Sequence, residues 1–336
     1  MRSFLAVSLI ILVLVLLDSL ARAELYEVRE IHYQMGTLLD ITLYHSDPKE
    51  GKKILRRSVQ EVHRLEGILS NYDPQSSLSF LNRHAGLGKV KVERELFHVL
   101  AVSVDFSVKT SGYFDVTVGP LVSLWRQAGE KRRMPSPDAL AQAVGLVGYR
   151  KLRLYDNGEA ELVHEEMSID LGGIGKGYAV DRVVEILKQA GVTRALINFG
   201  GSSIYALGGP IGDESWKIGV KGTNGKLVGM VHLRNQALST SGSMGRYWEI
   251  DGRRYGHLID PKSGWPVTKP RMATVVAETA TEGEALTKPL VLLGAADEFR
   301  FIKKHFPRVE ALVIAENEEL AFSGGFSAFF ETTKGQ

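Results

Sequence analysis

The sequence contains no cysteine among its 336 residues. Disulfide bonds, thiolate metal sites and a lipid anchor on cysteine are therefore all excluded. The chain also lacks an excess of charge of either sign, because 41 basic residues face 39 acidic ones. No basic stripe interleaved with aromatic residues is present, so nucleic acid is not an expected partner.

The amino terminus has the pattern of a secretory signal peptide. Arg2 precedes an apolar run from Phe4 to Leu17, and the triplet Ala-Arg-Ala follows at 21–23. Small residues thus occupy both positions that determine cleavage. The run is short for a membrane span, which needs about 20 residues. We expect cleavage after Ala23 and export to the periplasm. The alternative is an uncleaved segment that associates the protein with the inner membrane.

Hydrophobic residues make up 44% of the chain, enough for a buried core. Periodicity predicts a hairpin of strands 25–33 and 38–44, then helices at 48–69, up to 82 and at 96–108, and a helix that Gly191 ends. Short strands follow from 195 to 272, then helices, then strands at 311–314 and 320–322. Runs of strands separate from runs of helices indicate an α+β fold. The linker at 131–137 is too short to divide domains, so we expect one domain over 24–336.

The stretch IDLGGIGKGYAVD at 169–181 contains four glycines in six positions, with a lysine among them, before a predicted helix. Such loops let main-chain N–H groups bind an anion at a helix N-terminus. Two common phosphate-binding patterns do not match. Gly177 stands where a Walker loop needs Ser or Thr, and Tyr178 where a dinucleotide loop needs its third glycine. The loop therefore belongs to another scheme of anion binding.

Further polar or glycine-rich stretches accompany this loop in the chain. They are MGT at 35–37, SNYDPQSSLSFLN at 70–82, GYFDVTVGPLVSLW at 112–125, INFGG at 197–201, STSG at 239–242 and GHLIDPKSGWPV at 256–267. In this order and spacing, together with the glycine loop, they resemble the ApbE family of exported FAD:protein FMN transferases. The resemblance covers nearly the whole mature chain. It implies a T-fold-related α+β domain of mixed, largely antiparallel sheets with packed helices.

The resemblance also implies an activity. A family member divides the pyrophosphate of FAD, transfers FMN to a Thr or Ser hydroxyl of an acceptor protein and releases AMP. Bare N–H groups, a lysine and Mg2+ would then share the negative charge as it develops. The acceptor would be an exported protein or a membrane electron-transport subunit with a short Thr- or Ser-containing motif.

Individual site residues are also implied by the resemblance. The residues expected to contact FAD are Met35, Tyr72, Tyr113, Phe114, Asp115, Asp170, Lys176 and Leu258. His257 matches the family histidine beside the flavin phosphates, and the carbonyl of Gly173 matches a magnesium ligand. Several of these residues also have a purely structural interpretation. Asp170 is a candidate helix N-cap, Met35 and Tyr72 fit core or loop positions, Phe114 fits the core, and an isolated histidine is more often structural than catalytic.

The carboxy-terminal motif departs from the family pattern. The family has an aspartate and a threonine as magnesium ligands where this chain has Glu284 and Lys288. Glutamate can still bind magnesium through oxygen, but a charged lysine cannot be a ligand. Thr287 is one position out of register, about 100° around a helix. The candidate metal residues are therefore Gly173, Glu284, Thr287 and Lys288. The residue types at 284 and 288 leave open whether they form a complete magnesium site.

Two alternatives to a transferase follow from this departure. One is a non-catalytic FAD-binding protein on the same fold. The other is an FAD pyrophosphatase, in which water replaces the protein hydroxyl as nucleophile. On the residues alone, Glu284 and Lys288 are also spaced for a helical ion pair, and Pro289 indicates that a helix begins or bends there.

Overall fold

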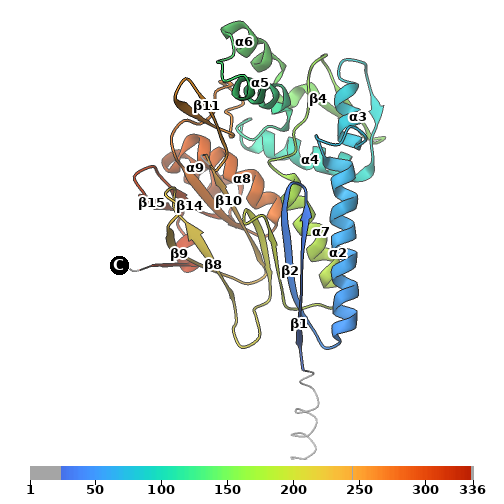
Figure 1. Cartoon of the computed structure of the whole chain (residues 1–336), viewed down its shortest axis with the longest axis vertical. Helices are drawn as coiled ribbons and strands as arrows, with labels where there is room; N and C mark the ends of the chain where they lie inside the picture. The colour runs from blue at the N-terminus through green and yellow to red at the C-terminus, as the bar shows by residue number, and fades with distance from the viewer. Residues whose placement is uncertain (1–23, 244, 334–336) are drawn as a thin grey trace, which may run out of the picture.

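The structure is a computed structural model that describes residues 24–243 and 245–333. Its main element is an eight-stranded sheet with the order β1-β2-β6-β7-β10-β13-β14-β15 (Figure 1). All neighbouring strands in this sheet are antiparallel. The strands are β1 (Tyr26–Gln34), β2 (Thr37–His45), β6 (Ala195–Phe199), β7 (Ser203–Leu207), β10 (Gln236–Gly242), β13 (Met272–Ala277), β14 (Glu310–Ile314) and β15 (Leu320–Phe322).

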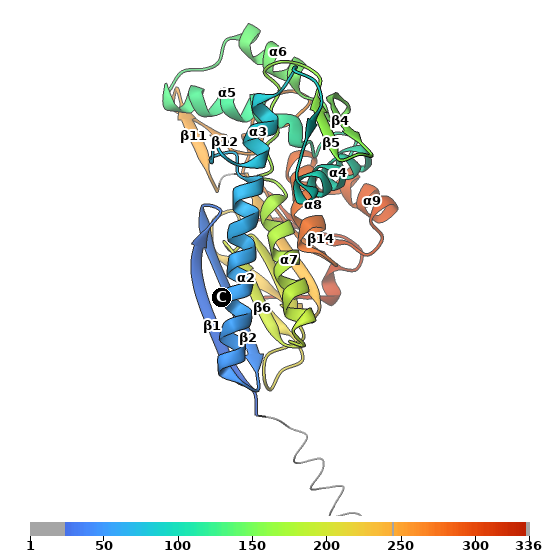
Figure 2. The same cartoon turned by 90° about the vertical axis from the view of Figure 1, so that its right-hand side faces the viewer.

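Three helices, α2 (Pro48–Leu69), α7 (Gly175–Gln189) and α8 (Ala280–Leu293), pack along one face of this sheet (Figure 2). The largest hydrophobic core lies between them and the strands. Helix α2 illustrates how the sequence produces this layer. Asp47 caps its first turn by accepting the Lys49 N–H, Pro48 starts the helix, and apolar residues recur along one side. That side includes the fully buried Leu55, Val62 and Leu65.

The opposite face of the sheet is covered by a small sheet with the order β16-β9-β8. Its strands are β8 (Trp216–Lys221), β9 (Leu227–Leu233) and β16 (Phe330–Thr332). A second core fills this layer, with the fully buried Phe326 at its centre. Helix α9 (Ala295–His305) follows α8, and the 3-10 turn η3 (Phe326–Ala328) precedes β16.

The remaining helices form a cap at one end of the molecule, at the top of Figure 1. The cap comprises α3 (Ser77–Arg83), α4 (Arg94–Lys109), η1 (Val116–Val118), α5 (Gly119–Glu130), α6 (Pro137–Leu146) and η2 (Tyr149–Lys151). Strands β3 (Val90–Lys91), β4 (Leu152–Tyr155) and β5 (Glu159–Leu162) form one small sheet, and β11 (Tyr247–Ile250) and β12 (Arg253–Gly256) another. A third core around Trp125 joins α5 and α6 to β11 and β12.

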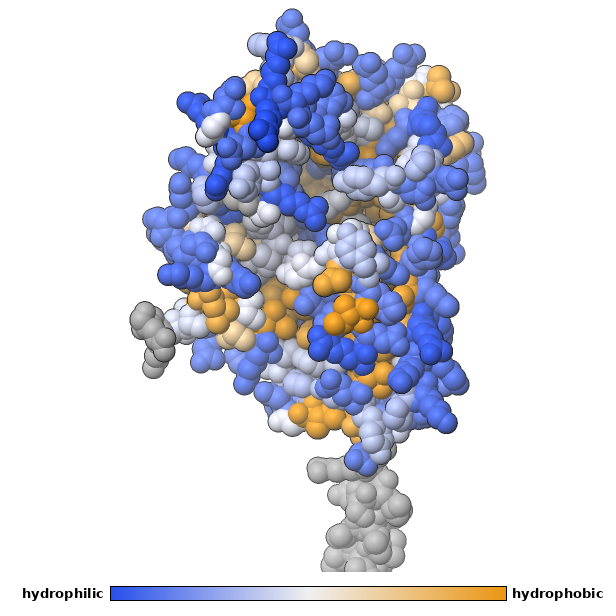
Figure 3. All heavy atoms as spheres, viewed as in Figure 1, coloured by the Kyte–Doolittle hydropathy of each residue, from blue (hydrophilic) through white to orange (hydrophobic). Residues whose placement is uncertain are grey.

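Apolar side chains lie exposed on the outer face of the β1–β2 hairpin, which is at the edge of the main sheet (Figure 3). They are Ile31, Tyr33 and Leu38, and Tyr33 pairs directly with Leu38 across the two strands. Hydrophobic side chains are therefore exposed on this hairpin, and Figure 3 shows further hydrophobic patches elsewhere on the same side of the molecule.

The structure confirms the predicted α+β fold with antiparallel sheets. Gly191 ends α7 as predicted, with φ of 77° and its N–H bonded to the Lys188 carbonyl. A helix that begins at Pro289, one of the two predicted alternatives, is wrong, because α8 runs through this residue, and the bend stays a prediction. The main-chain donor missing at Pro289 would have served the Ala285 carbonyl, whereas the side chains of Thr287 and Lys288 both donate to the neighbouring Glu284 carbonyl.

Two sequence predictions concern the ends and the division of the chain. The predicted signal peptide at 1–23 lies outside the described residues. Within the described part of the chain, no helix has both the length and the apolar character needed to cross a membrane. The single domain predicted over 24–336 stays a prediction.

Candidate functional site

The glycine-rich loop leads into α7 at a point where this helix touches α8. A side chain on Gly177 would meet the Ala280 carbonyl oxygen at 2.4 Å, so only glycine permits this approach. The close contact lets the Gly177 N–H donate to the carboxylate of Glu284, with a distance of 2.5 Å between N and Oε2. One glycine of the motif therefore joins two helices rather than leaving its amide for a ligand.

Lys176 and Glu284 form a partly buried ion pair in this junction. The distance from Lys176 Nζ to Glu284 Oε1 is 2.6 Å, and the Glu284 side chain is almost completely buried. Burial alone would raise the pKa of Glu284, but the charges of Lys176 and Lys288 and the hydrogen bonds from Lys176 and Gly177 lower it overall. Glu284 is therefore an anion at neutral pH with both carboxylate oxygens in use.

Lys288 lies one turn further along α8 and faces the glycine loop. Its Nζ donates to the Glu284 carbonyl at 2.8 Å and lies 3.3 Å from Thr287 Oγ1. A side chain on Gly173 would meet the Lys288 Cε at 3.3 Å. Burial lowers the pKa of Lys288 to about 8 against the opposing effect of Glu284, so most of the amine is charged at neutral pH. The predicted carboxylate pair between Glu284 and Lys288 is wrong, because the carboxylate binds Lys176 and Gly177 instead.

Thr287 is completely buried and belongs to a hydroxyl network. Its Oγ1 donates to the Glu284 carbonyl and lies 2.7 Å from the Oγ of Ser241, at the end of β10. The STSG motif therefore serves in part to connect β10 to α8. Ser241 was not among the predicted site residues, although that motif contained it.

His257 follows β12 and is partly buried. Its Nδ1 lies 2.9 Å from the Arg246 carbonyl oxygen, which can only accept, so Nδ1 carries the proton when the ring is neutral. Burial is the main cause that lowers the pKa of His257, and the charges of Lys288, Arg246 and Lys176 lower it further. The ring is therefore neutral at pH 7, with a free electron pair on Nε2. Leu258, the next residue, packs against the main core.

Asp170 lies at the start of the glycine loop, and its interaction differs from a helix cap. Its Oδ1 accepts the Gly172 N–H at 2.7 Å, whereas the residue at the cap position of α7 is Ile174. The preceding residue, Ile169, exchanges two hydrogen bonds with the side chain of Asn82. Asn82 was missed as an individual residue, although its motif was recognised, and it ties this loop to the helical cap.

The aromatic motif at 113–115 contributes three residues with different surroundings. Phe114 is buried against Phe106, and its ring lies 3.5 Å from the position of a side chain on Gly173. Tyr113 is partly exposed, with the Lys262 ammonium 3.5 Å from its ring centroid. Asp115 is buried, and it binds Thr117 and the Tyr149 N–H. Burial raises the pKa of Asp115. These contacts turn the Asp115 side chain inward.

Met35 and Tyr72 both lie at turns, but Met35 is half-buried against the main core whereas Tyr72 is exposed. Met35 has φ of 45° in the β1–β2 turn, and its N–H donates to Glu66. Tyr72 is 78% exposed, and its hydroxyl lies 3.4 Å from the Arg126 guanidinium. The INFGG motif adjoins the same hairpin, because a side chain on Gly200 would meet Thr37 Oγ1 at 2.7 Å. The short MGT and INFGG motifs are therefore neighbours in space.

The candidate metal residues do not fit magnesium in this arrangement. Glu284 uses both carboxylate oxygens on Lys176 and Gly177, Thr287 is held in its hydroxyl network, and the Lys288 ammonium lies among these groups. Magnesium requires several oxygen ligands at close range and is repelled by a charged amine. Within residues 24–243 and 245–333, no three His, Asp or Glu side chains come together as a metal site.

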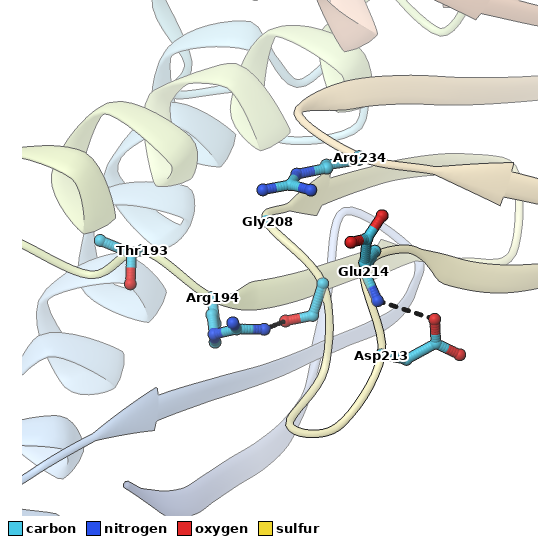
Figure 4. Close-up of a pocket in the computed structure, with 7 residues that line it drawn as sticks. Thr193, Arg194, Gly208, Asp213, Glu214 and Arg234 are labelled. Carbon is cyan, nitrogen blue, oxygen red and sulfur yellow. Dashed lines mark hydrogen bonds between the residues drawn. The ribbon is translucent and has the colours of Figure 1, made fainter. Parts of the chain in front are cut away.

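A cavity of about 280 Å³ lies elsewhere, near the carboxyl end of α7 (Figure 4). It is lined by Thr193, Arg194, Gly208, Gly209, Asp213, Glu214 and Arg234. The Arg194 guanidinium donates hydrogen bonds to the carbonyls of Gly209 and Pro210, and these bonds hold the loop after β7 in place. The length of α7, about 22 Å, separates this cavity from the glycine loop. It therefore takes no part in the candidate site.

The fold and the site define an α+β protein in which two lysines and a neutral histidine lie around a glycine-rich loop. The sequence model described as "ApbE family" matches residues 35–313. A relative from Treponema pallidum named FAD:protein FMN transferase is 30% identical over 323 residues, which is 90% of this chain and 89% of the relative. The chain belongs to the ApbE family.

Solved structures agree with this assignment. The crystal structure of the ApbE protein from Thermotoga maritima superimposes with a TM-score of 0.81 at 29% identity, over 91% of this chain and 99% of that one. The apo form of the Pseudomonas stutzeri flavinyl transferase ApbE gives a TM-score of 0.76 at 25% identity, over 92% and 95% of the two chains.

Proposed function

We propose that this protein is an FAD:protein FMN transferase. The enzyme would join the phosphorus of the FMN half of FAD to a Thr or Ser hydroxyl of an acceptor protein, breaking the bond to the AMP half and releasing AMP. The family assignment and the activity named for the Treponema relative support this proposal. The observation that carries it is the hydrogen bond from His257 Nδ1 to the Arg246 carbonyl, because it leaves Nε2 free to accept a proton.

The residues of the site divide the chemistry between them. His257 Nε2 would take the proton of the acceptor hydroxyl as the oxygen attacks phosphorus. Lys176 and Lys288 would face the pyrophosphate, whose negative charge increases as the bond to AMP breaks. Phe114 and Tyr113 would contact the flavin side of the substrate. Leu258 follows His257 and supports its position by packing on the core.

Magnesium was expected from the family resemblance. When bound in a flavin transferase, the ion would polarise the phosphoryl oxygens. The donor groups of Glu284, Thr287 and Lys288 do not favour it here, and no step of this mechanism depends on it.

The acceptor is proposed to be an exported protein or a membrane electron-transport subunit. The signal-peptide pattern of residues 1–23, which predicts export to the periplasm, supports this class of acceptor. The exposed Ile31, Tyr33 and Leu38 lie on the hairpin whose turn contains Met35. Acceptor and FAD would therefore approach the protein from the same end of that hairpin.

One experiment tests the activity. The mature protein is incubated with FAD and a candidate acceptor, and flavin fluorescence is followed on a denaturing gel while AMP is measured. Fluorescence on the acceptor with one AMP per flavin is the expected result. AMP with free FMN alone would indicate a pyrophosphatase, and FAD bound without any product would indicate a storage protein. Either outcome would contradict the proposal.

A further inference from the structure

Two ammonium groups bind the same residue of α8. Lys176 reaches it from α7 and binds the Glu284 carboxylate at 2.6 Å. Lys288 reaches it from α8 itself and binds the Glu284 carbonyl at 2.8 Å. The residue next to Lys176, Gly177, also donates its N–H to the same carboxylate. Glu284 thus fixes the positions of both lysines.

The charges in this cluster do not cancel. Glu284 supplies one negative charge against two ammonium groups, and the N-terminus of α7 adds its partial positive charge. Arg246 lies near enough to His257 for its charge to act on the imidazole together with those of the two lysines. Clustered like charges are costly in a partly buried site unless an anion neutralises them. The cluster therefore carries net positive charge, which an anionic ligand would neutralise.

The position of the Lys288 side chain is also determined by its neighbours. Its Cε comes within 3.3 Å of where a side chain on Gly173 would lie, so the absence of that side chain leaves room for the lysine. The Lys288 ammonium can donate three hydrogen bonds, and the contacts to Glu284 and Thr287 use two of them. One donor remains for a ligand at the glycine loop.

We propose that the Lys288 ammonium is a fixed cation of this enzyme that binds the pyrophosphate of FAD in place of a divalent metal ion. The inference rests on the proposed function, since it names how FAD is held at the same site. It deepens that function by making substrate binding independent of metal. Lys176 and the glycine loop contribute the rest of the positive potential, and Glu284 acts as the positioning residue for both lysines.

Binding of FAD to the mature protein, measured by calorimetry and by quenching of flavin fluorescence, tests the proposal without requiring turnover. The titration is made in EDTA and again in millimolar Mg2+. Wild-type protein should bind FAD equally well in both, within about twofold. Wild-type binding that disappears in EDTA and returns with Mg2+ would overturn the proposal, and this comparison depends on no variant.

Two substitutions sharpen the test. Lys288→Thr introduces the family side chain, so FAD affinity in EDTA should fall roughly tenfold or more, and Mg2+ should restore part of it. Lys288→Met keeps the length of the side chain but removes its charge. This variant should bind FAD more weakly than wild type, and Mg2+ should not restore the affinity. Lys226→Thr, on the exposed turn between β8 and β9, is the control and should bind like wild type. Equal affinity of Lys288→Met and wild type would also overturn the proposal.

The outcome is separable from that of the transferase proposal. Metal-independent FAD binding without FMN transfer would contradict the transferase activity and leave the role of Lys288 supported. FMN transfer combined with FAD binding that requires Mg2+ would support the transferase activity and contradict the role of Lys288. Circular dichroism of each variant confirms that the fold is intact before the affinities are compared.

Discussion

The Lys176 ammonium and the Glu284 carboxylate lie 2.6 Å apart, although 108 positions separate them in the sequence. The pair joins the first turn of α7 to the middle of α8 and brings the glycine loop next to Lys288. It also means that Lys176 has two tasks, which are to neutralise a buried carboxylate and to present charge to a ligand.

Replacement of Lys176 by alanine should weaken FAD binding roughly tenfold at low salt, because a charged contact to phosphate is lost. The deficit should shrink as salt rises, since a partly exposed charge is screened whereas packing is not. FAD titrations at several salt concentrations measure it. Lys188→Ala, at the exposed far end of the same helix, is the matched control. Equal affinity of the Lys176 variant and wild type at low salt would show that the loop binds alone.

Replacement of His257 by asparagine should reduce FMN transfer roughly 10²- to 10⁴-fold and leave FAD affinity nearly unchanged. In wild type the neutral imidazole is the active form, and its pKa is lowered from 6.5. The transfer rate should therefore rise with pH through a value below 6.5 and stay constant above it. Initial rates across this range check both points. The His63→Asn variant, at an exposed position of α2, should retain the wild-type profile, and a profile that falls with rising pH would contradict the role of His257 as base.

Asp181 should make wild-type stability depend on pH. Its carboxylate accepts N–H bonds from Ala280 and Thr281, yet burial raises its pKa to about 6 from the ordinary value of 3.8 for aspartate. The folded state therefore binds more protons than the unfolded state between these values, so stability should fall as pH rises from about 4 to about 6. The full effect is at most about 3 kcal/mol.

Urea unfolding of wild type and Asp181→Asn at several pH values measures this effect as a difference between two profiles. The exposed Asp156→Asn variant should run parallel to wild type. A wild-type advantage over Asp181→Asn that grows with pH in this interval would mean that the hydrogen bonds outweigh burial and the pKa is low.

Gly177→Ala should lower the free energy of unfolding by about 1–3 kcal/mol, because the new methyl group would meet the Ala280 carbonyl. Gly67→Ala is a matched helical control. Nothing lies within 4 Å of its new methyl group, so that variant should gain up to about 1 kcal/mol. Thermal or urea unfolding compares the two. Equal stabilities would show that α7 and α8 can separate at no cost.

The mature protein should begin at Glu24, because the apolar run and the small residues at 21 and 23 fit a cleaved signal peptide. Amino-terminal sequencing of protein from the periplasmic fraction checks this. An intact Met1 in the membrane fraction would support an anchor instead.

Local patterns predicted much of the fold. The helix at 48–69 has the same bounds in the structure, and the first hairpin differs by a residue at its ends, because capping and apolar periodicity depend on neighbours in sequence. The continuation of α8 through Pro289 was not predicted, because the local preference of proline is outweighed by the packing of this helix against α7, β10 and β13.

The site was less accessible to sequence reasoning. The residue types at Lys176, His257 and Lys288 pointed to an anionic ligand. No pattern showed that the Glu284 carboxylate would bind the distant Lys176 and not Lys288, which is only four residues away. Asn82 and Ser241 belonged to recognised motifs, yet their partners at Ile169 and Thr287 appear only after folding. Arg246 had no signal at all, because it contributes a main-chain carbonyl.

The backbone contact at Gly177 has a consequence for the lifetime of the protein. A ligand at the glycine loop would steady the first turn of α7, and with no side chain in between, it would also steady the adjoining start of α8. Local opening of α8 would become rarer, so its amide hydrogens would exchange more slowly with solvent. Proteases, which cleave locally opened segments, would then cut the chain less often. Substrate supply would thereby influence how long each enzyme molecule survives.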